Sequence, residues 1–236
     1  TTSKKLNSIK TILKKKNKLI GLNTDYWGFG KSINKFNIKK QDPILVLGAG
    51  GAGKAVISFI IKNFKKNKKY FFNRNHKKIS RFIKNYNEKK CIILKEYKNI
   101  SKIKDIKLII NTTSIGFNTW FGSKKKFYNL EYFSPLAPLN DIKLINKKEK
   151  KLFLKKNKKN IEKNLKISKK FFENNPNSKV YDIIYSPKKT NIMKHANSYK
   201  NYSLNGLNMN LDQAVIAFSK VNKIKSFEEI KKIMKK

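Results

Sequence analysis

The stretch from residue 44 to residue 61 constrains the fold of this chain more than any other. Its four apolar residues at 44–47, ILVL, lead directly into glycines at 48, 50 and 53, and an apolar helical pattern follows. In such a G-x-G-x-x-G turn the first glycine permits the bend, the second lets the backbone approach a diphosphate, and the third lets helix and strand pack closely. Free N–H groups at the helix N-terminus then bind phosphate. The pattern predicts a dinucleotide site, and a glycine-rich turn without a ligand is the alternative.

Further strand-like runs occur at 69–72, 91–94, 108–111 and 180–187, and helical patterns separate them. Strands that alternate with helices indicate a parallel sheet covered on both faces. We therefore expect an α/β fold, a Rossmann-like doubly wound parallel sheet with flanking helices. A hairpin of residues 6–13 and 18–22 is expected before it, and helices at about 205–221 and 227–234 after it. Residues 118–178 are dominated by lysine and asparagine and predict an insertion that is partly helical and partly mobile.

Arg74 follows the second of these strands, at the position where dinucleotide-binding folds recognise the adenosine ribose. An acidic residue there binds the 2′-hydroxyl group of NAD, whereas a nearby arginine accommodates the 2′-phosphate group of NADP. Residues 69–78 contain no carboxylate, and Arg74 is one of only two arginines in the chain. Its planar guanidinium group suits bidentate contact with phosphate. We therefore expect NADP rather than NAD as the cofactor.

The chain carries 57 Lys and Arg residues against 14 Asp and Glu residues, a formal net charge of +43. Such an excess ordinarily indicates nucleic acid or an anionic membrane as the partner. Here the lysines are spread along the whole chain, so we expect neither. A non-catalytic basic protein that binds nucleotides or RNA is the alternative of a different class. The positive field would still attract phosphorylated cofactors and carboxylate substrates.

Cys91 is the only cysteine, so the chain cannot form an internal disulfide and a reducing compartment is expected. No apolar run approaches the ~20 residues that span a bilayer. We expect a soluble protein of the cytoplasm, with a plastid as the alternative, either monomeric or homodimeric, and without a metal site. The chain starts at Thr1, with no methionine and no apolar signal segment, which suggests a piece of a longer protein.

Three polar positions lie where a ligand could meet them. Asp25, in the run Asn23-Thr24-Asp25, would either help to cap the helix that follows or project a carboxylate into a cleft beside the cofactor. Thr112 follows the strand at 108–111, so it would meet the nicotinamide group or only solvent. Gln213, among apolar neighbours of a late helix, would face a polar ligand or the surface.

Taken in order, these segments resemble shikimate dehydrogenase. The resemblance implies reversible reduction of 3-dehydroshikimate to shikimate with NADPH, a reaction of chorismate and aromatic amino-acid biosynthesis. It covers about residues 5–116 and 180–220 and leaves the lysine-rich range unmatched. Six spaced motifs carry it: Asn23-Thr24-Asp25 with Gly28-Phe29, Gly48-Ala49-Gly50-Gly51-Ala52, Asn73-Arg74, Asn111-Thr112-Thr113-Ser114-Ile115-Gly116, Asp182 with Tyr185 and Pro187, and Gly206, Met209 and Gln213-Ala214.

The resemblance assigns roles to individual residues. Asp25 would be the catalytic aspartate, which works with a lysine in proton transfer at the substrate oxygen. The substrate contacts would be Asn7, in a run that resembles the family's Asn-Thr motif with Ser8 in place of the threonine, together with Asp25, Tyr185 and Gln213. The cofactor contacts would be Gly48, Ala49, Gly50, Gly51, Ala52, Asn73, Arg74, Lys78, Thr112, Ile183 and Gly206.

The resemblance also implies a division of the chain. Residues 1–22 would be the hairpin remnant of an N-terminal substrate domain, residues 23–205 the NADP-binding domain with the insertion at about 118–178, and residues 206–236 helices that pack back towards the substrate domain. The family's lysine lies in a Thr-x-Pro-x-Lys run, which this sequence lacks. We therefore expect the polypeptide to bind NADP and to need a missing segment for activity.

Other enzymes share parts of these patterns. Residues 48–55 nearly fit the G-x-x-x-x-G-K-[ST] motif of nucleotide hydrolases, but Ala55 stands where the magnesium-binding hydroxyl belongs. Glutamyl-tRNA reductase has a similar glycine turn and Asn-Arg pair, yet it does not account for Asn23-Thr24-Asp25 or Gln213. Quinate dehydrogenase differs from shikimate dehydrogenase in its substrate, and the sequence does not separate the two.

Overall fold

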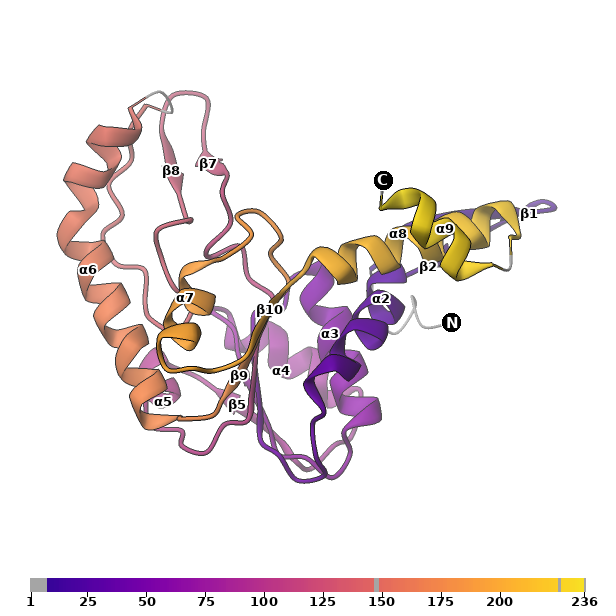
Figure 1. Ribbon diagram of the computed structural model, residues 1–236, viewed down its shortest axis with the longest axis horizontal. Coiled ribbons are helices and arrows are strands. Elements are labelled where there is room, and N and C mark those ends of the chain that lie inside the picture. Colours follow the sequence, from indigo (N-terminus) through magenta and orange to yellow (C-terminus); the bar gives the residue numbers. More distant parts are fainter. Residues whose placement is uncertain (1–7, 147–148, 225, 236) are drawn as a thin grey trace.

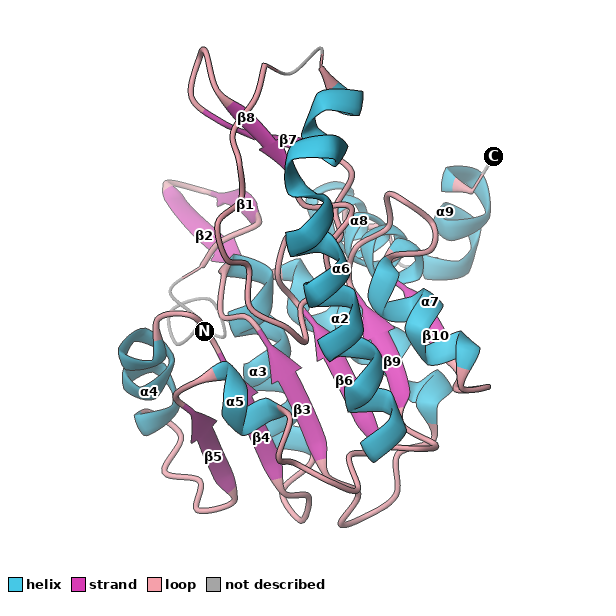
Figure 2. Ribbon diagram, turned by 90° about the vertical axis from the view of Figure 1, so that its left-hand side faces the viewer, coloured by secondary structure: helices cyan, strands magenta, loops and turns pink. Residues whose placement is uncertain are grey.

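A six-stranded parallel sheet forms the centre of the molecule in the computed structural model, which describes residues 8–146, 149–224 and 226–235 (Figures 1 and 2). The strands lie in the order β10-β9-β6-β3-β4-β5. Their bounds are β3 Ile44–Leu47, β4 Lys69–Phe72, β5 Cys91–Leu94, β6 Leu108–Asn111, β9 Lys179–Asp182 and β10 Ser203–Asn205. Numbered along the chain, these six strands follow the order 3-2-1-4-5-6 from one edge, which is the doubly wound dinucleotide-binding topology. The predicted fold class is confirmed.

Both faces of the sheet are covered, which explains why the central strands are continuously apolar. Val46 and Ile110 point to one face, where they pack against α2 (Thr24–Ile33), α3 (Gly51–Asn63) and α4 (His76–Lys84). Leu45 and Ile109, one residue earlier in each strand, point to the other face, towards α6 (Lys150–Asn174) and α7 (Asn191–Ser198). This alternation is the two-residue period of a strand. Every residue of β3 and β6 is therefore buried.

The strand order reverses between β3 and β6, and this position defines the ligand-binding edge of the sheet. Chain connections from β3 lead away to β4 on one side, while β6 lies on the other side, with Leu47 opposite Asn111. In doubly wound sheets ligands bind beyond the carboxyl ends of the strands at such a reversal. The glycine turn after β3 and the polar run after β6 both emerge there.

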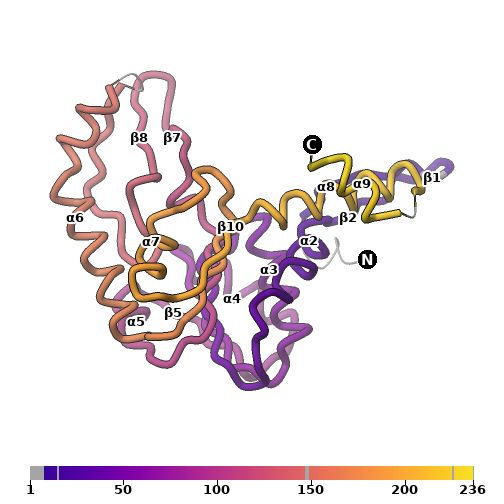
Figure 3. Tube along the Cα trace, viewed as in Figure 1, coloured from indigo at the N-terminus to yellow at the C-terminus, as the bar shows by residue number. Residues whose placement is uncertain are grey.

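Elements from the two ends of the described chain pack together, since α8 (Leu207–Asn222) lies against α2 (Figure 3). A hairpin of β1 (Thr11–Lys15) and β2 (Lys18–Leu22) precedes α2 and a single turn of 3-10 helix, η1 (Asn34–Phe36), and α8 and α9 (Phe227–Met234) close the chain. Gly28 makes the crossing of α2 and α8 close, because a Cβ at Gly28 would lie 2.8 Å from the Met209 carbonyl oxygen. Asp212 of α8 forms an ion pair with Lys231 of α9.

Residues 118–178, the expected insertion, contain more regular structure than the sequence predicts. A short hairpin of β7 (Trp120–Gly122) and β8 (Phe127–Asn129) packs on α6 through a cluster around Phe133 and Phe153. This arm stands beyond the carboxyl ends of the strands, on the side opposite α8 and α9 (Figures 1 and 2). The last turns of α6 belong to the sheet itself, because Phe171 and Phe172 pack in the same core as β3 and β6.

A buried hydrogen-bond chain fastens α6 to α7. Ser168 of α6 lies 2.9 Å from Nδ1 of His195 in α7 and 2.6 Å, hydroxyl to hydroxyl, from Ser134. Burial lowers the pKa of His195 to about 4, so the imidazole is neutral at physiological pH. None of the helices in the described part of the chain combines the length and apolar character needed to cross a membrane.

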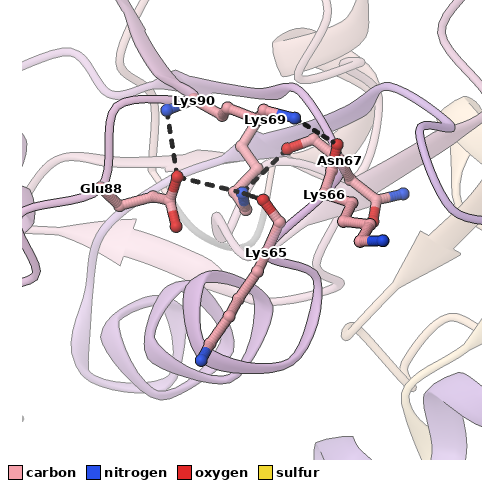
Figure 4. Close-up of polar contacts among 6 residues, drawn as sticks. All are labelled: Lys65, Lys66, Asn67, Lys69, Glu88 and Lys90. Atoms are coloured by element: carbon pink, nitrogen blue, oxygen red, sulfur yellow. Dashed lines mark hydrogen bonds and ion pairs between the residues drawn. The ribbon is translucent and has the colours of Figure 1, made fainter.

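A buried lysine lies at the opposite edge of the sheet, where β4 begins (Figure 4). The Lys69 ammonium group donates a hydrogen bond of 2.8 Å to the Asn67 carbonyl and lies 3.9 Å from the Glu88 carboxylate. It also lies 3.5 Å from the Lys65 carbonyl, just beyond the C-terminus of α3, where a positive charge is favourable. This position is remote from the carboxyl ends of the strands, so Lys69 has a structural role.

Candidate functional site

The glycine turn after β3 is held in place by the neighbouring strand. Gly48 adopts a φ of +97°, which L-residues rarely adopt. Thr112, at the end of β6, donates a hydrogen bond of 2.8 Å to the Leu47 carbonyl. Its hydroxyl group would lie 2.7 Å from a Cβ at Gly48 and 2.6 Å from a Cβ at Gly53. Glycine is required at both positions because the Thr112 hydroxyl occupies the space between them.

Gly50 has a different surrounding. A Cβ added there would meet no atom of the described residues within 4 Å, so the space beside this glycine is open. Gly50 is also the residue before the first turn of α3, and no side chain caps the N–H groups of that turn. An open backbone next to an uncapped helix N-terminus is the arrangement that binds a phosphate group. These residues fit the diphosphate of a dinucleotide.

Arg74 lies one strand away from this turn. The Gly48 N–H donates a hydrogen bond of 2.8 Å to the carbonyl of Phe72, the last residue of β4, so the chain leaves β4 beside the turn. Asn73 donates to the Asn75 carbonyl, and Asn75 accepts from the Lys78 N–H at the start of α4. The Arg74 side chain is exposed and has no hydrogen bond or ion pair in the described structure. Its guanidinium group is thus available to an external phosphate.

The ends of β6 and β9 are joined by a buried carboxylate, Asp182. It accepts hydrogen bonds from Thr190 Oγ1 at 2.6 Å, the Ile184 N–H at 3.0 Å and Asn111 Nδ2 at 3.0 Å. Burial raises the pKa of Asp182 to about 7, although the three donors act in the opposite direction. The network holds the backbone on which two expected cofactor contacts lie. The Ile183 N–H donates to the Asn111 carbonyl, and Gly206 packs on the Ile183 carbonyl so closely that a side chain would not fit.

Asp25 lies in the first turn of α2. Asn23 caps this helix through a hydrogen bond of 3.3 Å from the Tyr26 N–H, so the predicted cap is Asn23 and Asp25 remains available for another role. Asp25 is only 6% exposed. Its Oδ2 atom lies 3.3 Å from Nζ of Lys10. Burial raises the pKa of Asp25, and the Lys10 ammonium group lowers it.

Of the other expected substrate residues, Gln213 lies beside the start of α2. Thr24 donates a hydrogen bond of 3.0 Å to Gln213 Oε1, which brings the polar side chain of α8 beside the start of α2. Tyr185 is 44% exposed, and its ring centroid lies 6.3 Å from that of Phe117. Asn7 lies outside the described residues. No three His, Cys, Asp or Glu side chains of the described residues are grouped so that they could hold a metal ion.

Ser8 connects the Asp25 region to the glycine turn. Its carbonyl accepts a hydrogen bond of 3.1 Å from Asn23 Nδ2. Its hydroxyl group would lie 3.6 Å from a Cβ at Gly51. The start of α2 and the start of α3 therefore adjoin each other through one residue. The structure thus places the start of α2, where Asp25 lies, near the glycine turn through Ser8.

Two features of this site were not apparent from the sequence. Lys10 is one lysine among many in its segment, and no signal distinguishes it. The hydrogen-bond network of Asp182 does have a signal, since a carboxylate interrupts the apolar run at 180–184. A charged residue inside a buried strand requires partners, but the sequence does not name Asn111 and Thr190 as those partners.

No protein-family model matches the chain. A shikimate dehydrogenase (NADP(+)) of Clostridium beijerinckii is 41% identical over 115 residues, which are 48% of this chain and 40% of that enzyme. A shikimate dehydrogenase (NADP(+)) of Pelagibacter ubique is 32% identical over 220 residues, or 89% of this chain and 61% of that enzyme. The crystal structure of a chorismate mutase/shikimate 5-dehydrogenase fusion protein from Clostridium acetobutylicum superposes with a TM-score of 0.66 at 26% identity, covering 99% of this chain and 69% of the other.

The chain thus spans less than two thirds of the length of these two curated relatives. The similarity nevertheless extends over the glycine turn, the six-stranded sheet and the helices on both faces, since the match to the fusion protein covers 99% of the chain. The resemblance that the spaced motifs indicate is confirmed. In sequence and in fold, this chain is a relative of the shikimate dehydrogenases.

Proposed function

We propose that this chain binds NADP and takes part in the reversible NADPH-dependent reduction of 3-dehydroshikimate to shikimate. The observation that carries the proposal is the open backbone at Gly50 on the uncapped start of α3, with the unpaired Arg74 one strand away. The names of the relatives, shikimate dehydrogenase (NADP(+)), support the same activity. Because the chain spans only part of those relatives, the activity of the whole enzyme is a proposal for this protein.

The cofactor would be held by three groups of residues. The backbone at 48–52 and the start of α3 would bind the diphosphate. Arg74 and Lys78 would bind the adenosine 2′-phosphate, with Asn73 alongside. Thr112, Ile183 and Gly206 would border the nicotinamide end, on the backbone that the Asp182 network holds. When bound, NADP supplies the hydride acceptor, and NADPH the hydride donor, for the ring carbon of the substrate.

Asp25 would act on the substrate oxygen. As the hydroxyl group of shikimate is oxidised, the Asp25 carboxylate accepts its proton, and in the reverse direction it returns a proton to the carbonyl oxygen. Such proton transfer contributes about 10² to 10⁴ in rate. Gln213, Tyr185 and Asn7 would bind the other oxygens of the ring. Gln213 is suited to this because its amide is already oriented by Thr24.

A cofactor titration tests the proposal most directly. NADPH binds more tightly than NADH to the wild-type chain, and Arg74→Gln lowers NADPH affinity about 10- to 100-fold, because a charge-assisted contact is lost. Affinity for NADH, which lacks the 2′-phosphate, changes little. Arg81→Gln is the matched control, since Arg81 is the only other arginine and is also exposed. Equal affinity of wild type for the two cofactors would contradict the proposal. Both affinities are measured by the fluorescence of the reduced nicotinamide.

Turnover, measured on the chain joined to the substrate-domain segment that the resemblance implies, tests the substrate. Oxidation of shikimate is followed by the appearance of NADPH, with quinate as the comparison substrate. Asp25→Asn, which keeps the shape of the side chain but cannot accept the proton, lowers turnover about 10²- to 10⁴-fold and leaves NADPH affinity unchanged. Turnover of quinate but not of shikimate would move the assignment to quinate dehydrogenase. A cytoplasmic location and a monomeric or homodimeric state remain predictions of the same proposal.

A further inference from the structure

Lys10 is placed next to Asp25 by the hairpin that precedes α2. The Lys10 N–H donates a hydrogen bond of 2.8 Å to the Leu22 carbonyl, so this residue continues the ladder of β1 and β2. Asn23, which follows Leu22, donates a hydrogen bond to the carbonyl of Ser8, two residues before Lys10. The backbone of Lys10 is therefore fixed at both sides, and its side chain reaches the Asp25 carboxylate, with 3.3 Å between Nζ and Oδ2.

Asp25 depends on this contact. Its side chain is only 8% exposed, and Oδ2 accepts no hydrogen bond from another group of the described structure. A buried carboxylate without compensation becomes protonated at higher pH, and a neutral Asp25 could not accept a proton. The Lys10 side chain is 44% exposed, so its ammonium group stays hydrated on one side while it contacts the carboxylate on the other.

The other elements packed against Asp25 present no competing charge in the described structure. On the side of α8, the neighbouring group is the neutral amide of Gln213, reached through Thr24. Asp212 of the same helix is paired with Lys231 of α9. Lys10 is the one charged group that acts on the ionisation of Asp25 among the residues described.

We propose that Lys10 is a positioning residue of this site: its ammonium group keeps the buried Asp25 carboxylate charged and in one orientation, ready to accept a proton. The last part of this statement rests on the function proposed above. The electrostatic part does not, because it concerns only two side chains of this chain. Lys10 lies in the hairpin and not in a Thr-x-Pro-x-Lys run, so it is a separate group from the lysine that the resemblance implies.

The titration of the Asp25 carboxyl carbon tests the proposal without the need for turnover. The chain contains six aspartates, so carbon-13 labelling of aspartate gives a resolvable set of signals, and Asp25→Asn assigns the relevant one. Lys10→Met shifts the midpoint of this signal to higher pH. Lys10→Arg restores the wild-type midpoint, because the charge returns at the same place. Lys10→Gln is a second neutral variant for the case in which Lys10→Met folds poorly.

Lys14→Met is the matched control, since Lys14 is exposed on the same hairpin and has no ion pair in the described structure. It removes the same net charge and leaves the Asp25 midpoint unchanged. An unchanged midpoint in Lys10→Met, or an equal shift in Lys14→Met, would overturn the proposal. Where turnover is measured, the acidic limb of the kcat/KM profile moves to higher pH in Lys10→Met and returns in Lys10→Arg. Absence of NADPH binding in all variants would instead contradict the proposed function, and the carboxyl titration would still decide the role of Lys10.

Discussion

At the scale of single residues, Asp182 shows how a carboxylate without access to water can organise a site. It is fully buried, and it accepts hydrogen bonds from Asn111 at the end of β6, from Thr190 just before α7 and from the Ile184 N–H just after its own strand. Two residues that would border the nicotinamide lie next to this network in the chain: Thr112 follows Asn111, and Ile183 follows Asp182 itself. Its role is to fix the backbone rather than to touch a ligand.

Asp182→Asn tests this role through the pH dependence of stability. The variant leaves a donor without its acceptor, which costs about 1–3 kcal/mol. Burial raises the pKa of Asp182 from 3.8 to about 7, so the folded protein binds this proton more tightly than the unfolded chain. The contribution of Asp182 to stability is therefore full below 3.8 and is lost as the pH rises through about 7. The difference in unfolding free energy between wild type and variant narrows over this window.

Urea unfolding at a series of pH values measures that difference. Asp141→Asn is the control, because Asp141 is exposed and its replacement gives no comparable trend. A difference that is constant with pH would show that folding does not change the pKa of Asp182.

At the scale of elements, the bounds of β3, β4, β5 and β6 agree with the sequence prediction to the residue, and burial explains the agreement for the central pair. The predicted run at 180–187 is longer than β9, which ends at Asp182, and β10 was not predicted. All residues of β3 and β6 are buried, because helices cover both faces of these strands. The apolar run in the sequence therefore marks the strand closely. The strands β7 and β8 were not predicted, because each has three residues and is only partly buried. The length of α6 was missed because its buried positions include Asn157, Asn164 and Ser168, which read as polar surface.

The glycine turn permits a comparison of two identical substitutions within one element. Gly53→Ala lowers the free energy of unfolding by about 1–3 kcal/mol, because the new Cβ meets the Thr112 hydroxyl. Gly50→Ala changes stability by less than ~0.5 kcal/mol, since the added methyl group meets only open space. It nevertheless weakens NADPH binding by at least about tenfold, because that space is where the diphosphate would lie.

Thermal unfolding and NADPH titration of both variants measure these effects. Two results would contradict the proposed diphosphate position: a destabilised Gly50→Ala variant, or a Gly50→Ala variant that binds NADPH as tightly as wild type.

At the scale of the whole molecule, the net charge of +43 affects both the stability of the fold and its affinity for anions. Only 14 acidic residues offset the 57 basic ones, so the folded chain is destabilised by repulsion among its lysines. Added salt screens this repulsion, since the Debye length falls to ~10 Å at 0.1 M ionic strength. The Tm therefore rises with sodium chloride, while NADPH affinity falls.

Scanning calorimetry and fluorescence titration in the same buffers measure the two trends. Chloride is preferred to sulfate or phosphate, because the latter anions would compete for the start of α3. A Tm independent of chloride would mean that the lysines are too far apart to repel one another.

The shape of the glycine turn depends on Thr112, whose hydroxyl group lies between Gly48 and Gly53. Thr112 and Leu47 are separated by 65 positions in the chain, and the pairing of β6 with β3 brings them together. A chain that contains the glycine motif but not β6 would therefore have the sequence of the motif without the contact that supports its conformation. The proposed nucleotide site therefore depends on the pairing of β3 with β6, and not on the glycine motif alone.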